Sequence, residues 1–213
     1  MRTLFSIHSK RGFGYCEPRF TFFLYISKMG KNNSKLKPEE LDDLKLNTQF
    51  NDSEIKEWYK AFMMDFPGGK LNRTQFRKLY GNLFPNGDES KFVEHAFKNF
   101  DADGDGFVDF REFMWAMSIT SKGDLEQRLE WAFSMYDLDG DGFITRNEML
   151  EIVRSVQRMV GNTKETVENT TPEERVDQIF TQMDKNNDGK LTKEEFITGS
   201  KYDNSVSKLL SLN

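Results

Sequence analysis

Cysteine, histidine and long apolar runs are all scarce in this chain of 213 residues. The single cysteine, Cys16, excludes an intrachain disulfide and favours a reducing compartment. The longest apolar stretch, "FTFFLYI" at 20–26, is much shorter than the ~18 residues of a membrane span. We therefore expect a cytoplasmic protein whose body does not cross a membrane.

Catalytic and nucleic-acid-binding signals are also missing from the sequence. His8 and His95 are isolated histidines, and neither a nucleophile–base arrangement nor a phosphate-binding loop accompanies them, so we expect no enzymatic activity. A formal net charge of −5 argues against nucleic acid as the main partner. What the chain does have is phenylalanine, with 20 copies, many of them beside acidic loops.

One acidic motif of twelve residues occurs three times: "DADGDGFVDFRE" (101–112, loop 2), "DLDGDGFITRNE" (137–148, loop 3) and "DKNNDGKLTKEE" (184–195, loop 4). Each fits D-x-[DN]-x-[DN]-G-x5-E, the calcium loop of an EF-hand. Calcium takes several oxygen ligands, from side chains at positions 1, 3 and 5, the carbonyl at position 7 and a bidentate glutamate at position 12. The candidate ligands are Asp101, Asp103, Asp105, Phe107 and Glu112; Asp137, Asp139, Asp141, Phe143 and Glu148; and Asp184, Asn186, Asp188, Lys190 and Glu195.

The other loop positions predict local structure. Glycine at position 6 allows the sharp turn, and an apolar residue at position 8 suits a short strand that pairs two loops. Position 9 is a good N-cap, and the glutamate three residues later completes a capping box. One stretch thus encodes both an ion site and the start of the next helix.

A degenerate copy, "MDFPGGKLNRTQ" (64–75, loop 1), precedes the three intact ones. The glycine and Leu71 at positions 6 and 8 are kept, but Met64, Phe66 and Gly68 occupy positions 1, 3 and 5 and Gln75 occupies position 12. With almost no carboxylate left, we expect a folded hand that binds no calcium and whose Leu71 pairs with Val108.

Helical apolar spacing flanks all four loops, so we expect an all-α fold of four EF-hands in two pairs, a compact two-lobed calcium sensor with short antiparallel β pairing between loops. Most apolar stripes should form the core. The first pair is so rich in large aromatics that part of the set is a candidate groove for an amphipathic helix of a target protein. The groove candidates are Trp58, Phe62, Phe76, Tyr80, Phe84, Phe97 and Phe113.

Residues 29–213 resemble a neuronal calcium sensor of the visinin-like, hippocalcin and neurocalcin type. The resemblance rests on "MGKNNSKLKPEEL", "EWYKAFMMDFPGGKLN", "LYGNLFPNGDESKFVEHAFKNFDADGDGFVDFREF", "LEWAFSMYDLDGDGFITRNEMLEIV" and "QMDKNNDGKLTKEEF". The family's usual first hand has Cys-Pro where this chain has Phe66-Pro67, and the hand is still expected to be silent. The resemblance implies regulation of membrane-associated targets such as receptor kinases, cyclases, channels or lipid kinases.

The resemblance also implies a calcium–myristoyl switch with Gly30 as the acceptor, since "MGKNNS" fits the myristoylation signature. One myristoyl chain binds membrane only marginally, so Lys31, Lys35 and Lys37 would supply the second signal for calcium-dependent association with the cytoplasmic membrane face. Two alternatives stay open: a calcium buffer, whose hands barely open, and a permanent regulatory subunit of a channel or enzyme.

The switch requires that translation begin at Met29. Residues 1–28 fit a secretory signal or a transit peptide poorly, and we interpret them as upstream sequence or as an alternative isoform without the lipid. We divide the chain into the extension (1–28), a myristoylation segment and arm (29–50), EF-hand pair 1 (51–120), EF-hand pair 2 (121–200) and a tail (201–213). Acidic residues at the ligand positions and position 9 number five, four and three in loops 2, 3 and 4, so the calcium affinities should differ.

Overall fold

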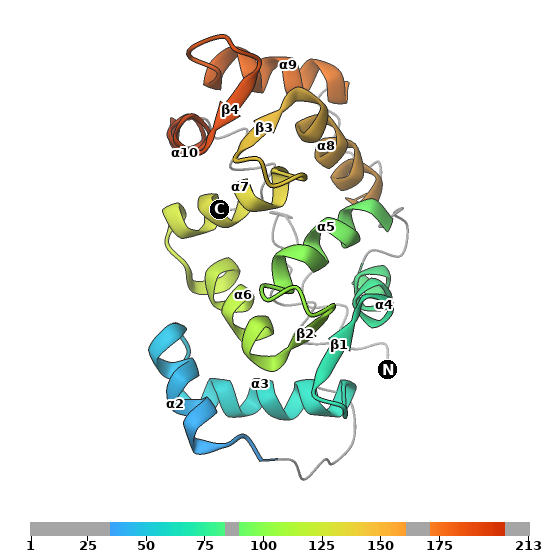
Figure 1. The fold of residues 1–213 in the computed structure, drawn as a ribbon, viewed down its shortest axis with the longest axis vertical. Coiled ribbons are helices and arrows are strands. Elements are labelled where there is room, and N and C mark those ends of the chain that lie inside the picture. The colour runs from blue at the N-terminus through green and yellow to red at the C-terminus, as the bar shows by residue number, and fades with distance from the viewer. Residues whose placement is uncertain (1–34, 84–89, 161–170, 203–213) are drawn as a thin grey trace, which may run out of the picture.

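The structure, a computed structural model, describes residues 35–83, 90–160 and 171–202. These residues form helices and two short two-stranded sheets, one in each half of the molecule (Figure 1). The expected all-α architecture of paired EF-hands is therefore confirmed.

The first half is built from an arm helix and two helix–loop–helix units. Its elements are α2 (Pro38–Asn47), α3 (Asp52–Asp65), β1 (Lys70–Asn72), α4 (Arg73–Leu83), α5 (Ser90–Phe100), β2 (Phe107–Asp109) and α6 (Phe110–Lys122).

The second half repeats the same helix–strand–helix order twice. Its elements are α7 (Leu125–Tyr136), β3 (Phe143–Thr145), α8 (Arg146–Val160), α9 (Pro172–Met183), β4 (Lys190–Thr192) and α10 (Lys193–Tyr202).

Capping residues set where the helices begin. The side chain of Asn51 accepts hydrogen bonds from the backbone N–H groups of Ser53 and Glu54, and the Glu54 carboxylate accepts one from the Asn51 N–H. Asp109 and Glu112 form the same reciprocal box at the start of α6. Both boxes satisfy backbone donors that have no partner within the helix, and the box at Asp109 starts α6 at the loop position that the sequence predicts.

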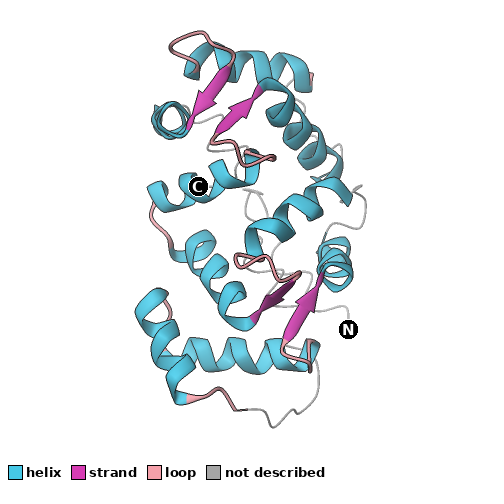
Figure 2. Ribbon diagram, viewed as in Figure 1, coloured by secondary structure: helices cyan, strands magenta, loops and turns pink. Residues whose placement is uncertain are grey.

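Each sheet joins the two loops of one pair in antiparallel register (Figure 2). Leu71 lies opposite Val108 in the first sheet, and Ile144 lies opposite Leu191 in the second. All four side chains are 0% exposed, so the apolar residue at position 8 anchors each loop pair to the core. The predicted pairing of Leu71 with Val108 is confirmed.

The halves share a continuous apolar core. Helix α5 packs on both α7 and α8, and the rings of Phe100 and Trp131 meet edge to face with centroids 6.1 Å apart. Gly123 joins α6 to α7, and its N–H donates to the carbonyls of Ser118 and Ile119. A Cβ on Gly123 would lie 2.4 Å from the Ile119 carbonyl oxygen, so this tight connection requires glycine.

Candidate calcium-binding loops

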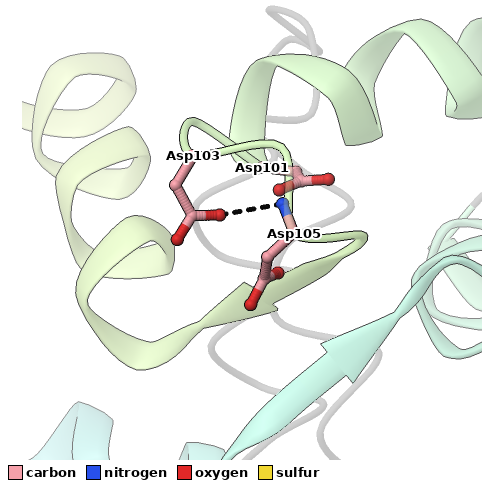
Figure 3. Close-up of side chains that lie close together, drawn as sticks. All are labelled: Asp101, Asp103 and Asp105. Carbon is pink, nitrogen blue, oxygen red and sulfur yellow. Dashed lines mark hydrogen bonds between the residues drawn. The ribbon is translucent and has the colours of Figure 1, made fainter.

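Loop 2 folds its acidic side chains inward through hydrogen bonds from its own backbone. Asp101 Oδ2 accepts from the Gly106 N–H, Asp103 Oδ1 from the Asp105 N–H and Asp105 Oδ1 from the Phe107 N–H, at 3.0, 2.9 and 2.8 Å. Figure 3 shows the three aspartates on the curve of the loop, with the Asp103–Asp105 bond dashed. One carboxylate oxygen from each of Asp101, Asp103 and Asp105 lies within 4.8 Å of the others.

The position-12 glutamate closes the loop from the opposite end. Glu112 Oε1 accepts hydrogen bonds from the backbone of Ala102 and Asp103, and Oε2 accepts one from the Asp109 N–H. A single carboxylate therefore touches the start of the loop and the N-terminus of helix α6.

Loop 3 repeats this arrangement in the second half. Asp137 Oδ2 accepts from the Gly142 N–H at 3.0 Å, and Glu148 bonds both the Leu138 N–H and the Thr145 N–H. The carboxylates of Asp137, Asp139 and Asp141 also lie within 4.8 Å of one another. Two loops that are distant in sequence thus present the same inward-facing set of oxygens.

Loop 4 keeps the arrangement with an amide in place of one acid. Asp184 Oδ2 accepts from the Gly189 N–H at 2.9 Å, and Glu195 accepts from the backbone of Lys185 and Thr192. Asn186 Oδ1 accepts from the Asp188 N–H at 3.0 Å, as the acid at position 3 does in the other loops. The amide supplies an oxygen without a charge, so loop 4 retains the ligand geometry with weaker electrostatic attraction.

Left-handed backbone at position 6 makes these turns possible. Gly106, Gly142 and Gly189 have φ angles of +84°, +88° and +82°, a region that L-residues with a Cβ rarely adopt. The sharp turn expected from the sequence is present in all three loops.

The chemistry of loop 2 fits a hard divalent cation. Asp101 is buried, and its Oδ1 has no hydrogen-bond partner among the described residues. A buried, unpaired carboxylate oxygen is costly unless a cation or donor meets it. Burial also raises the pKa of the Glu112 carboxyl, so that carboxylate too lacks full compensation for its lost hydration. Five acidic side chains around one turn are the ligand set that calcium prefers.

Loop 1 keeps the backbone turn and the capping box of the other loops but has different side chains at the ligand positions. Gly69 keeps the left-handed φ of +72°, and Asn72 and Gln75 form a capping box like those above. At position 3, where the other loops carry a ligand, Phe66 is buried and its ring packs on Phe62 with centroids 5.1 Å apart. The residue that replaces the ligand therefore strengthens the core instead of facing an ion.

Comparison with known proteins agrees with this geometry. The EF-hand domain pair family matches residues 126–201, and the EF hand domain family matches residues 92–120. The chain is 52% identical over 185 residues to neuronal calcium sensor 1 of Lymnaea stagnalis, with 86% of this chain and 97% of the relative covered. The chain belongs to the neuronal calcium sensor family. Human recoverin is 40% identical over 188 residues, covering 85% of this chain and 93% of recoverin.

Membership in this family confirms two expectations from the sequence. The resemblance to neuronal calcium sensors is confirmed, and so is the absence of enzymatic function, because the neuronal calcium sensor, recoverin and visinin families are non-enzymatic calcium sensors. Among the described helices, none is long and apolar enough to span a bilayer.

Five of the seven candidate groove aromatics lie in the core. Trp58, Phe62, Phe76, Phe97 and Phe113 are all less than 10% exposed. Their rings pack on one another: Trp58 and Phe62 have centroids 5.7 and 5.3 Å from Phe113, and Phe76 meets Phe97 at 5.4 Å. These five rings therefore do not line an open groove in this structure. Phe84 and the side chain of Tyr80 lie outside the described residues.

The lipidation segment is described only in part. Gly30 and Lys31 lie outside the described residues, whereas Lys35 and Lys37 are exposed. Lys37 immediately precedes α2, and its backbone N–H donates to Glu40 Oε2 at 3.3 Å. The role of the lysines at a membrane stays a prediction.

Helix α2 and the ion pair between Lys70 and Asp105 of loop 2 were not foreseen from the sequence. Asp43 on α2 bonds Arg111 Nε at 2.8 Å, and Leu44 is buried, which fixes the arm against α6. The sequence signal for α2 was present: proline at the first helical position followed by two glutamates. Lys70 bonds Asp105 across the first sheet, a contact between residues 35 apart that no local pattern indicates.

Proposed function

We propose that this calcium sensor takes up three calcium ions, one in each of loops 2, 3 and 4, and leaves loop 1 empty. The observation that carries the proposal is one arrangement of side-chain oxygens repeated three times. Oxygens at positions 1, 3 and 5 accept hydrogen bonds from the backbone of the loop, and a glutamate at position 12 bonds to position 2 and position 9. The carbonyls of Phe107, Phe143 and Lys190 at position 7 would add a further ligand each.

Calcium uptake is coupled to helix movement through the position-12 glutamate. Glu112 accepts from the Asp109 N–H at 2.9 Å at the start of α6 and from Ala102 at the start of the loop. Bidentate ligation of an ion would draw this carboxylate toward the cation, and α6 would move with it. The sensor hand then opens relative to the preceding helix.

Movement of α6 would uncover the aromatic cluster of the first half. Phe110 and Phe113 on α6 pack on Tyr59, Phe62 and Trp58 of α3, with centroids between 5.0 and 5.7 Å apart. Separating the two helices would expose these ring faces together. Large aromatics exposed side by side suit the apolar face of an amphipathic helix from a signalling target.

In a chain that begins at Met29, Gly30 would carry a myristoyl group that calcium releases to the cytoplasmic membrane face. The exposed Lys35 and Lys37 support this, because basic residues next to a single acyl chain supply the second signal that it needs. Residues 1–28 hold five basic residues and one acidic residue, so the chain from Met29 carries −9. Three calcium ions would reduce that to −3 and weaken repulsion from anionic lipids.

Vesicle sedimentation tests the membrane part of this proposal. The chain from Met29, produced with an N-myristoyltransferase, is centrifuged with vesicles of phosphatidylcholine and phosphatidylserine in calcium or EGTA. We expect pelleting in calcium only, and no pelleting of the Gly30→Ala variant, which differs only in lacking the lipid. Glu112→Gln should also stay in the supernatant in calcium. Unchanged pelleting of Glu112→Gln, or pelleting in EGTA, would contradict the switch.

Retention on an apolar resin tests the opening of the hands. The chain without lipid should bind phenyl-Sepharose in calcium and elute in EGTA, because ring faces become accessible only on opening. A calcium buffer would not be retained in either condition. A permanent regulatory subunit would instead co-purify with its target in EGTA.

A further inference from the structure

A lysine from the silent loop contacts a calcium ligand of its neighbour. Lys70, at position 7 of loop 1, donates from Nζ to Asp105 Oδ2 at 2.5 Å. Asp105 is position 5 of loop 2, and its other oxygen accepts the Phe107 N–H. The carboxylate is thus held between its own backbone and a cation from the adjacent hand.

The strand pairing of the two loops places the lysine there. Lys70 lies opposite Asp109 in the first sheet, next to the pair formed by Leu71 and Val108. The stem of Lys70 also brings Nζ to 5.5 Å from the Phe107 ring. Lys70 therefore faces the carboxylate cluster of loop 2.

The second pair contains the same contact in a weaker form. Lys190, at position 7 of loop 4, has its Nζ 3.8 Å from Asp141 Oδ2 at position 5 of loop 3, and it lies 4.9 Å from the Phe143 ring. Loop 4 has acidic residues at positions 1, 5 and 12, whereas loop 1 has no carboxylate at positions 1, 3, 5 or 12. In the first pair, loop 1 therefore contributes the positive charge of Lys70 beside the loop 2 ligand Asp105.

We propose that Lys70 lowers the calcium affinity of loop 2, and so sets the calcium concentration at which the first half responds. The inference deepens the proposed function and rests on calcium binding by loop 2. A fixed positive charge beside a ligand repels an incoming divalent cation and competes for the ligand's oxygen. Counting acids alone would rank loop 2 as the tightest site, and Lys70 offsets one of its five acidic charges.

Calcium titration calorimetry on the full chain tests the role of Lys70. The parent carries Glu148→Gln and Glu195→Gln so that heat reports loop 2 alone. Lys70→Met keeps the length of the side chain and removes its charge. We expect its calcium dissociation constant to fall about threefold to tenfold at low salt, the size expected for like charges several ångströms apart in a solvated site. The gain should shrink in 0.5 M KCl, because salt screens exposed charges.

Two matched variants separate charge from shape. Lys70→Arg keeps the positive charge and should bind calcium like the parent. Lys60→Met makes the same charge change on an exposed position of α3, outside the calcium loops, and should leave the affinity unchanged. Far-ultraviolet circular dichroism verifies that each variant is folded.

The possible results are distinguishable. Unchanged or weaker affinity in Lys70→Met would overturn the role of Lys70 while leaving calcium binding by loop 2 intact. An equal gain in Lys60→Met would assign the effect to net charge and would also overturn it. No calcium heat in the parent would refute both the loop 2 site and the inference built on it.

Discussion

Replacing Leu71 by alanine tests whether the first hand, which contains loop 1, is a structural element. Leu71 is 0% exposed and lies opposite Val108, which is also 0% exposed, in the middle of the first sheet. The change removes apolar groups worth about 0.8 kcal/mol for each buried methylene. It also leaves a cavity that the paired strands cannot close, and buried Leu→Ala changes typically cost about 2–5 kcal/mol.

We therefore expect the free energy of unfolding to drop by about 3–4 kcal/mol. Urea denaturation in EDTA, followed by circular dichroism, measures this in the absence of calcium linkage. Leu46→Ala is the matched control, because Leu46 on α2 is 86% exposed and its truncation should change stability by less than about 0.5 kcal/mol. A loss below about 1 kcal/mol for Leu71→Ala, or equal losses in both variants, would refute a structural role for the first hand.

Three further predictions concern single side chains. Gln75→Glu should not create a fourth calcium site, because positions 1, 3 and 5 of loop 1 still lack carboxylates; a gain of one ion by calorimetry would contradict this. Glu148→Gln should remove one calcium ion and leave helix α8 folded, since glutamine also completes a capping box; calorimetry and circular dichroism report the two effects. Hydrogen bonds from the Lys122 ammonium and the Asn51 backbone lower the pKa of the Glu54 carboxyl. The ionised carboxylate therefore stabilises the folded state at pH values above its unfolded pKa near 4.5. This stabilisation is lost as the pH falls through the lower pKa of the folded state. Lys122→Met should flatten the fall of the urea midpoint between about pH 5 and pH 3, and an unchanged slope would count against the pair.

Local chemistry explains why so much of the fold could be predicted from the sequence. The position-6 glycines, the capping box at Asp109 and the apolar residue at position 8 each act within a few residues, and each occurs in the structure as expected. The calcium loops are contiguous, so their spacing alone brings the oxygens together.

Features that depend on contacts between distant residues could not be read in the same way. Lys70 reaches Asp105 only because two strands pair, and α2 is held by an ion pair between Asp43 and Arg111, 68 residues apart. The aromatic set from Trp58 to Phe113 illustrates a different limit. Apolar spacing identifies side chains that leave water, but the same spacing serves a closed core and a groove that opens.

The number of calcium ions bound by the full chain tests the central claim most directly. Calorimetric titration of the calcium-free protein should give three ions, and Glu112→Gln, Glu148→Gln and Glu195→Gln should each remove one, because each loop depends on its own position-12 carboxylate. Four ions would show that loop 1 is not silent. A stoichiometry that the three substitutions leave unchanged would contradict the assignment of calcium to these loops.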